Sequence, residues 1–393
     1  MKLVTRLLGA LGLVAAILNC RDGAGPRPDS TSVGAGEPFW KATSFFGSSR
    51  PAIDSTSVFV ADTGHVLWAI DRANGAVRWH VSIGGTAETH PRDALVSHGT
   101  VVVGDQQLYA FNARDGSPRW TFTNSTIPGT LYLGGDDSTV YAGAYVGSSA
   151  ELFAIRFSDG SQRWKTVVVP DSILTTGEPL RLYGPVYSGG VVFVAFNWQR
   201  MDLRKNVGGI AAIDASTGTL LWSRTLPRPV DEKSTLPSNP AALNGVVVVS
   251  TLDGNVYALN SADGVVRWSA PPVVLGDGSS PFQDGRVVGI GSDVVVAGSG
   301  LGVITAFAAT DGRRLWQTDP RLGALVEHVT VASYAVFSNH FTGPIASVDR
   351  SSGGINWRFD TSHQINVGFV ESRLSGDTLY ATGWGGLWAL RAR

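Results

Sequence analysis

The side chains that could perform catalysis or bind a metal ion are scattered along this chain of 393 residues. Metal sites need ligands at short, regular spacings, such as two histidines four residues apart on one helix face. The seven histidines show no such spacing: His65, His80, His90, His98, His328, His340 and His363. We therefore predict no metal site, no catalytic residue and a chain that is not an enzyme.

The acidic and glycine-rich segments also favour structural roles. Asp115, Asp159, Asp263 and Asp311 each precede a glycine, and Asp-Gly pairs supply the positive φ of tight turns. Residues 298–302 (GSGLG) resemble a phosphate-binding loop, but no helix follows them to provide an N-terminus for the phosphate. We interpret this run as a hairpin turn. No Gly-x-Ser-x-Gly elbow between a strand and a helix is present, which argues against a hydrolase.

The single cysteine, Cys20, predicts a lipid attachment site. Lys2 and Arg6 precede twelve residues, 7–18, without a polar side chain, which is typical of a secretory signal and too short to span a membrane. A cysteine at the end of this run resembles the acylated cysteine of bacterial lipoprotein signals, although Asn19 differs from the small residue usual before it. The alternatives are a secretory signal cut elsewhere and an uncleaved anchor.

These features divide the chain into three parts. Residues 1–19 are the predicted signal peptide, and residues 20–36 are the lipidated cysteine with a flexible tether rich in Gly, Pro, Ser and Asp. Residues 37–393 are the predicted folded domain. The net charge is −1 and only 16% of the residues are charged. No basic face is therefore expected to bind nucleic acid.

A glycine followed four residues later by a tryptophan recurs seven times along the folded part. Successive tryptophans lie 41 to 58 residues apart, and a period of about 40 to 50 residues is typical of propellers. The turn glycines are Gly75, Gly116, Gly160, Gly218, Gly264, Gly312 and Gly353. The tryptophans with a predicted structural docking role are Trp40, Trp79, Trp120, Trp164, Trp222, Trp268, Trp316 and Trp357.

Each repeat contains the strands of one propeller blade. An apolar strand, such as residues 67–71, precedes the glycine turn and carries a small Ala or Ser six residues before the glycine. A Val-rich strand such as residues 101–103 comes before it, and the tryptophan strand follows the turn. With one more strand in front, each repeat forms a four-stranded antiparallel blade.

The two ends of the folded part complement one another. Residues 386–393 repeat the strand before the turn, while residues 39–42 form a tryptophan strand with no turn before it. Pairing them in one composite blade removes a free sheet edge. The predicted fold is all-β: a monomeric eight-bladed β-propeller whose ring is closed by the N- and C-terminal strands.

The repeat resembles that of a known superfamily. Residues 69–79 (AIDRANGAVRW) and 212–222 (AIDASTGTLLW) are similar to the tryptophan-docking repeat of quinoprotein-like (PQQ-repeat) eight-bladed propellers. A short chain with a lipoprotein signal and a tether resembles the BamB family in particular. This resemblance implies a non-catalytic scaffold without a cofactor, anchored by lipid to the periplasmic side of the outer membrane. Its implied partner is the outer-membrane β-barrel assembly complex.

Two other functions remain open. The larger relatives in the superfamily are dehydrogenases that use pyrroloquinoline quinone (PQQ) and calcium, so a PQQ-dependent dehydrogenase is the first alternative. The well-known alcohol-oxidising members carry a vicinal cysteine pair, which a chain with Cys20 alone cannot form, although some relatives lack that pair. A ligand-binding or sensor propeller is the second alternative.

The longest repeat contains the residues that we predict to bind a partner. Trp164 and Trp222 are 58 residues apart, and segments 170–185 and 197–206 absorb the additional length. The second segment combines aromatic, apolar and basic groups, as interfaces do; the alternative is a loop that covers a blade edge. BamB-like proteins contact their partner through a Leu-x-Leu-Arg-type stretch, which residues 180–184 (LRLYG) resemble, whereas residues 234–240 lack the acids of the next equivalent loop. The predicted partner-binding residues are Leu180, Arg181, Leu182, Tyr183, Trp198, Arg200, Met201, Leu203 and Arg204.

Overall fold

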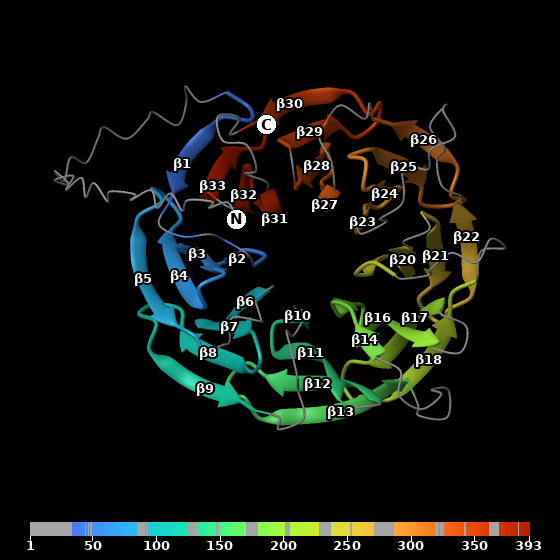
Figure 1. The fold of residues 1–393 in the computed structure, drawn as a ribbon, viewed down its shortest axis with the longest axis horizontal. Helices are drawn as coiled ribbons and strands as arrows, with labels where there is room; N and C mark the ends of the chain where they lie inside the picture. The colour runs from blue at the N-terminus through green and yellow to red at the C-terminus, as the bar shows by residue number, and fades with distance from the viewer. Residues whose placement is uncertain are drawn as a thin grey trace, which may run out of the picture.

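In the computed structural model the chain forms a ring of eight β-sheets around a central axis (Figure 1). The structure describes residues 34–393 except 44, 46, 48, 85–90, 92, 124–131, 147–148, 170–179, 201–204, 228–236, 252–253, 271–286, 319–321, 323–325, 342, 361–368 and 384. The described residues contain no α-helix, and so no helix that could span a membrane. The predicted all-β, eight-bladed propeller is confirmed.

The blades are numbered in chain order, and the strands of each run from the channel outward. Blade 1 comprises β2 (Ala52–Ile53), β3 (Ser57–Ala61), β4 (Val66–Asp71) and β5 (Val77–Ser82). Blade 2 comprises β6 (Ala94–Ser97), β7 (Thr100–Gly104), β8 (Leu108–Asn112) and β9 (Pro118–Phe122). Blade 3 comprises β10 (Tyr132–Gly135), β11 (Thr139–Val146), β12 (Ser149–Arg156) and β13 (Gln162–Val169). Blade 4 comprises β14 (Leu180–Leu182), β15 (Val186–Ser188), β16 (Val191–Arg200), β17 (Lys205–Asp214) and β18 (Leu220–Thr225).

The remaining four blades complete the circle. Blade 5 comprises β19 (Ala241–Leu243), β20 (Val246–Ser250), β21 (Val256–Asn260) and β22 (Val266–Ala270). Blade 6 comprises β23 (Val287–Ile290), β24 (Val294–Gly298), β25 (Ile304–Ala308) and β26 (Arg314–Gln317). Blade 7 comprises β27 (Val326–Val331), β28 (Ala335–His340), β29 (Ile345–Asp349) and β30 (Ile355–Phe359). Blade 8 comprises β31 (Phe369–Ser375), β32 (Thr378–Gly383), β33 (Gly386–Arg391) and β1 (Pro38–Ala42).

The hydrophobic core is divided among the boundaries between blades. The described buried side chains form eight clusters, and each cluster joins two neighbouring blades. The second strands, such as β7 and β20, are buried at every position, because both faces of their sheets are covered. A blade alone would leave both apolar faces in water, so each one depends on its two neighbours.

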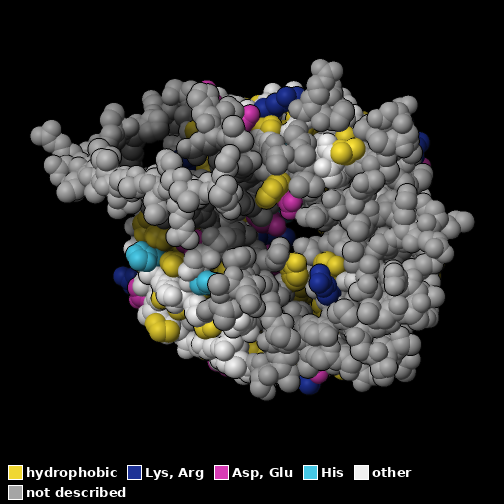
Figure 2. Space-filling model, viewed as in Figure 1, with side chains coloured by type: hydrophobic (Ala, Val, Ile, Leu, Met, Phe, Trp, Pro, Cys, Tyr) yellow, Lys and Arg dark blue, Asp and Glu magenta, His cyan; other side chains and the backbone are white. Residues whose placement is uncertain are grey.

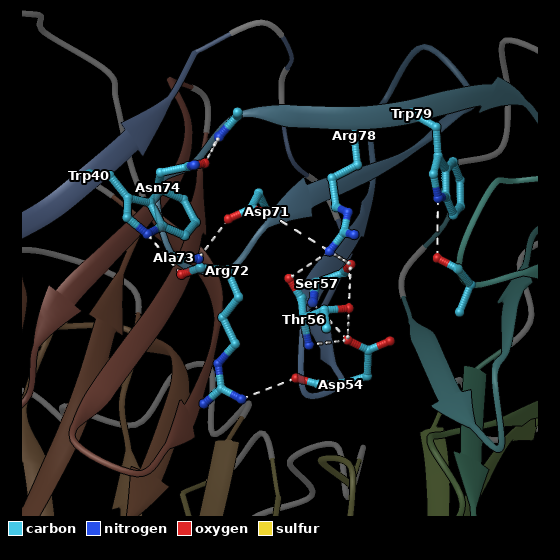
Figure 3. A network of polar contacts seen from close by, with 12 residues as sticks. Trp40, Asp54, Thr56, Ser57, Asp71, Arg72, Ala73, Asn74, Arg78 and Trp79 are labelled. Atoms are coloured by element: carbon cyan, nitrogen blue, oxygen red, sulfur yellow. Dashed lines mark hydrogen bonds and ion pairs between the residues drawn. The ribbon is translucent and has the colours of Figure 1, made fainter. Parts of the chain in front are cut away.

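Each docking tryptophan links its blade to the next. The indole nitrogen of Trp79 donates to the carbonyl of Ala113 (3.1 Å), and the ring covers Gly116. At the boundary between blades 8 and 1, the indole nitrogen of Trp40 likewise donates to the carbonyl of Arg72 (3.1 Å; Figure 3). The acceptors for the eight indoles, from Trp40 to Trp357, are the carbonyls of Arg72, Ala113, Phe157, Ala215, Ser261, Ala309, Arg350 and Ala392.

Blades 3 to 6 bury their docking indoles more deeply than the other blades do. The side chains of Trp164, Trp222, Trp268 and Trp316 are buried, whereas those of Trp40, Trp79, Trp120 and Trp357 are half-buried. The ring of Trp268 covers Gly312 in blade 6, and the ring of Trp316 covers Gly353 in blade 7. Each indole therefore makes the same contact with a turn glycine at all eight boundaries, and only the solvent exposure of the tryptophan differs.

Strand register explains the small residue before each turn. Ala69 lies directly opposite Trp79, and Ala110 lies directly opposite Trp120. Directly paired residues share one face of a sheet, so a large residue in place of alanine would meet the indole. The small residue therefore leaves the indole free to reach the neighbouring blade.

Blade 8 closes the ring through a turn that is divided between the two ends of the chain. The amide of Gly36 donates to the carbonyl of Arg391 (2.8 Å), as the amide of Gly75 donates to Asp71 (2.9 Å) inside a continuous turn. The amide of Arg391 donates in return to the carbonyl of Glu37 (2.9 Å). Gly36 also has a positive φ of 85°. The sequence places Gly36 in the tether and finds no turn before Trp40, but the structure shows that Gly36 is the eighth turn glycine.

We predict that Gly116→Ala destabilises the protein more than Gly99→Ala does. Both glycines belong to blade 2 and have nearly equal φ, 73° and 72°. A Cβ at Gly116 would lie 2.8 Å from Cε3 of Trp79, whereas a Cβ at Gly99 meets nothing within 4 Å. We expect a loss of about 1 kcal/mol at Gly99 from backbone strain and about 3 kcal/mol at Gly116. Urea unfolding measures both values, and equal losses would contradict the docking role of the glycine.

We also predict that a circular permutant of the protein keeps the fold. In this permutant Arg393 is joined directly to Ala35, and the new ends are opened in the exposed turn at residues 189–190. The junction reproduces the five-residue length of the continuous turn at residues 71–75. Because the new bond moves the chain break from blade 8 to an exposed turn of blade 4, the melting temperature should stay close to that of the wild type. A permutant joined from Arg393 to Gly36 is one residue too short and should melt lower; equal melting of the two permutants would contradict the divided turn.

Candidate functional site

Blade 4 brings the two predicted partner-binding segments together. Leu180 in β14 pairs with Trp198 in β16, and Arg181 pairs with Asn197. β16 and β17 have ten residues each, and their hairpin ends at the pair formed by Arg200 and Lys205. We name the surface of β14 and this hairpin the blade 4 edge. Two stretches that are separate in the sequence therefore form one surface.

The described side chains of this set have different environments. Leu182 is buried and packs into the core between blades 3 and 4, so it supports the edge from beneath. Tyr183 is half-buried and its ring lies 6.4 Å from that of Tyr132; burial raises the pKa of Tyr183 to about 12. Arg181 is exposed. The side chains of Leu180, Trp198 and Arg200, and all of Met201, Leu203 and Arg204, lie outside the described part of the structure.

A second site, which we name the central cavity, lies in the channel. It has a volume of about 380 Å³ and is lined by described residues of blades 1, 2, 3, 4, 7 and 8. Charged groups from Arg50, Asp93, His328 and Arg373 form one part of its wall, and Leu95, Leu133 and Tyr187 form another. Figure 2 shows acidic and basic side chains at the hollow near the centre of the ring.

Ion pairs at the channel wall connect neighbouring blades whose residues are distant in the sequence. Nε of Arg50 lies 3.3 Å from Oε2 of Glu371 and 3.9 Å from Oδ1 of Asp93. Nδ1 of His328 lies 3.0 Å from the same Oε2 of Glu371. The other oxygen of Asp93 accepts a hydrogen bond from the amide of Leu133 (3.1 Å). Together these contacts connect residues of five successive blades, from blade 7 through blades 8, 1 and 2 to blade 3.

The surroundings shift the pKa values of these groups in opposite directions. Burial alone would raise the pKa of Glu371, but the charges of His328 and Arg50 outweigh it and hold this pKa at about 2. Burial disfavours the charged form of Arg50, yet the carboxylates of Glu371 and Asp93 outweigh it and raise the pKa of Arg50. Burial and the nearby charge of Arg50 lower the pKa of Arg373, and the charge of Asp93 offsets only part of this effect.

Sequence reasoning did not find the central cavity. Arg50 and Glu371 are 321 residues apart, so no local spacing connects them. The one sequence feature that could have indicated the cavity is the pair of charged residues within an inner strand, Glu371 and Arg373 in β31. Among the described residues no group of three His, Cys, Asp or Glu side chains could hold a metal ion. The turn interpretation of residues 298–302 is confirmed, because they connect the antiparallel strands β24 and β25.

The eight blades and the tryptophan in each of them define the chain as a β-propeller of the PQQ-repeat class. A family model described as outer membrane protein assembly factor BamB matches residues 30–181 and 171–393. The chain therefore belongs to this family, as its repeats predict.

Individual relatives show how far the similarity extends. The chain is 32% identical over 255 residues to outer membrane protein assembly factor BamB of Escherichia coli (strain K12), which covers 61% of this chain and 59% of that protein. It is 30% identical over 189 residues to the dehydrogenase subunit of a quinone alcohol dehydrogenase from Komagataeibacter europaeus, covering 43% of this chain and 24% of that one. The solved structure of BamB from Moraxella catarrhalis superimposes with a TM-score of 0.64 at 15% identity, over 89% of this chain and 98% of that one. The matched regions span less than two thirds of these curated relatives.

We predict that Glu371→Gln removes an acid-sensitive part of the stability. The pKa of Glu371 falls from 4.5 to about 2 on folding, so its contribution is complete above pH 4.5 and disappears as the pH falls from 4.5 to 2. Its upper limit is about 3 to 4 kcal/mol, since one pKa unit corresponds to about 1.4 kcal/mol. The variant should melt lower than the wild type at pH 7, and the difference should vanish near pH 2.

Thermal unfolding from pH 2 to pH 7 measures this dependence. Asp360→Asn is the control, because Asp360 is exposed and follows β30 on the outer rim. It should leave the wild-type pH profile unchanged. A profile for Glu371→Gln that runs parallel to the wild type between pH 2 and 4.5 would contradict the role of this carboxylate.

Proposed function

We propose that the protein is a non-catalytic scaffold of the cell envelope that binds protein partners during outer-membrane β-barrel protein assembly. The observation that carries the proposal is the BamB family match, which extends from residue 30 to residue 393. Quinone alcohol dehydrogenases also match, but the first of them is matched over only 24% of its own length. In this proposal the propeller works without PQQ or calcium.

The blade 4 edge is the proposed contact surface. β16 and β17 have ten residues each, compared with five in β20 and β21 of the next blade. β14 pairs with the longer hairpin at the inner edge of the sheet. The side chain of Arg181, in β14, is exposed. Buried Leu182 fixes this edge to blade 3. A charged group on a rigid support suits the recognition of another protein.

The proposal includes the N-terminal segment as the membrane anchor. Cleavage before Cys20 followed by acylation would attach the chain to lipid, and residues 21–33 would connect the anchor to the closing turn of blade 8. In this proposal the acylated cysteine and its tether would hold a monomeric propeller at the periplasmic face of the outer membrane. There it can reach the barrel assembly complex without crossing the bilayer.

The test is co-purification from detergent-solubilised envelopes of cells that produce the tagged full-length protein. We expect the barrel assembly complex to be enriched with the wild type, and Arg181→Glu to reduce this enrichment at least about fivefold, because a repelling charge at an interface costs on the order of 1 kcal/mol or more. Arg313→Glu is the matched control. Arg313 is exposed in the turn before β26, two blades away in blade 6, and its replacement should not change the yield.

Two outcomes would contradict the proposal. One is a wild-type preparation that never enriches the barrel assembly complex. The other is an enzyme activity: reduction of an artificial dye with alcohols or sugars that appears when PQQ and calcium are added and disappears when they are removed.

A further inference from the structure

The central cavity contains a cation that has no ion-pair partner among the described residues. Arg373 lines the cavity from β31, two residues after Glu371. Alternate residues of a strand share one side, so Arg373 and Glu371 extend from the same side of β31. No described residue forms an ion pair or accepts a hydrogen bond from the guanidinium of Arg373.

The nearby carboxylates are already engaged by other groups. Glu371 lies 3.3 Å from Arg50 and 3.0 Å from His328. Asp93 pairs with Arg50 and accepts the amide hydrogen of Leu133, so its charge reaches Arg373 only from a distance. Arg373 is solvent-exposed at the cavity wall, and desolvation by that wall together with the nearby charge of Arg50 lowers its pKa. Such a charge is stabilised by an anion that enters the cavity.

The rest of the wall indicates what else an occupant must have. Leu95, Leu133 and Tyr187 line the cavity from blades 2, 3 and 4. Tyr187 is 38% exposed, and its ring stacks on Tyr141 at 6.2 Å with an interplanar angle of 12°. This stacking holds the ring in place beside the cavity. A ligand that satisfies both parts of the wall has an anionic group and an apolar body.

The volume restricts the occupant to a small molecule. The cavity measures about 380 Å³, near the lower end of the range of about 300 to 1,000 Å³ for small-molecule sites. A folded partner does not fit into such a space. A guanidinium binds a carboxylate through two parallel hydrogen bonds, which also fixes the orientation of the ligand.

We propose that the central cavity binds a small organic carboxylate, whose anionic group pairs with Arg373 and whose apolar body lies against Leu133 and Tyr187. This site is independent of the scaffold function, because none of the predicted partner-binding residues of the blade 4 edge lines the described part of the cavity wall.

Binding of benzoate to the full-length protein tests the proposal, with isothermal titration calorimetry and ligand-observed NMR as the measurements. Benzamide has the same shape without the charge, and inorganic phosphate has the charge without the apolar body. We expect benzoate to bind with a dissociation constant on the order of 1 mM, as suits so small a ligand. Benzamide and phosphate should bind at least about tenfold more weakly.

Two variants assign the binding to Arg373. Arg373→Gln should weaken benzoate binding about tenfold, and Arg373→Lys should weaken it several-fold because lysine keeps the charge but loses the two-point contact. The lysine variant also provides the test if the glutamine variant does not fold. Arg358→Gln is the control, because Arg358 is exposed on β30 at the outer rim of blade 7; it should bind benzoate like the wild type.

Three results would overturn the proposal: no saturable binding of benzoate, equal binding of benzoate and benzamide, and unchanged binding in both Arg373 variants. Phosphate binding as tight as that of benzoate would overturn the assignment to an organic ligand. Co-purification of partners through Arg181 reports on a different surface, so either function can fail while the other stands.

Discussion

The contact between an indole and a glycine of the next blade is the interaction on which the ring depends. Trp79 covers Gly116 and donates to the carbonyl of Ala113, and the same arrangement recurs at every blade boundary. Because the buried apolar clusters lie between blades, each sheet is stable only with two neighbours. The two end blades of such an array must therefore be covered by other residues or must pack against each other in a closed ring. The tryptophan contact is the link between each blade and the next around this ring.

The ring closes at blade 8, where the two ends of the folded part meet. There the turn that elsewhere is continuous is formed by Gly36 and Arg391, which backbone hydrogen bonds hold together. Trp357 donates to the carbonyl of Ala392, and Trp40 donates to that of Arg72, so both ends of the folded part are tied to their neighbours. The chain break therefore carries the same hydrogen bonds as the continuous turns, and β1 covers the edge of β33 that would otherwise be free.

The ring also creates the two candidate sites, in different ways. The inner strands converge on the axis, which places Arg50 beside Glu371 and brings Arg373, Leu133 and Tyr187 to the wall of the central cavity. The blade 4 edge instead comes from a local extension, in which β16 and β17 are longer than the strands of blade 5. The proposed small-molecule site and the proposed protein contact therefore share no described residue.

The sequence by itself determined the repeat, the number of blades and the composite closure, because glycine, small-residue and tryptophan positions recur within single hairpins and record local geometry. It also located the blade 4 segments, since added length is visible in the spacing from Trp164 to Trp222. Only the tertiary structure decided that Leu182 is buried, that Gly36 belongs to the closing turn, and that Arg50, Glu371 and His328 meet in the channel. These outcomes depend on contacts between residues up to several hundred positions apart, which no local pattern encodes and which exist only after the ring has closed.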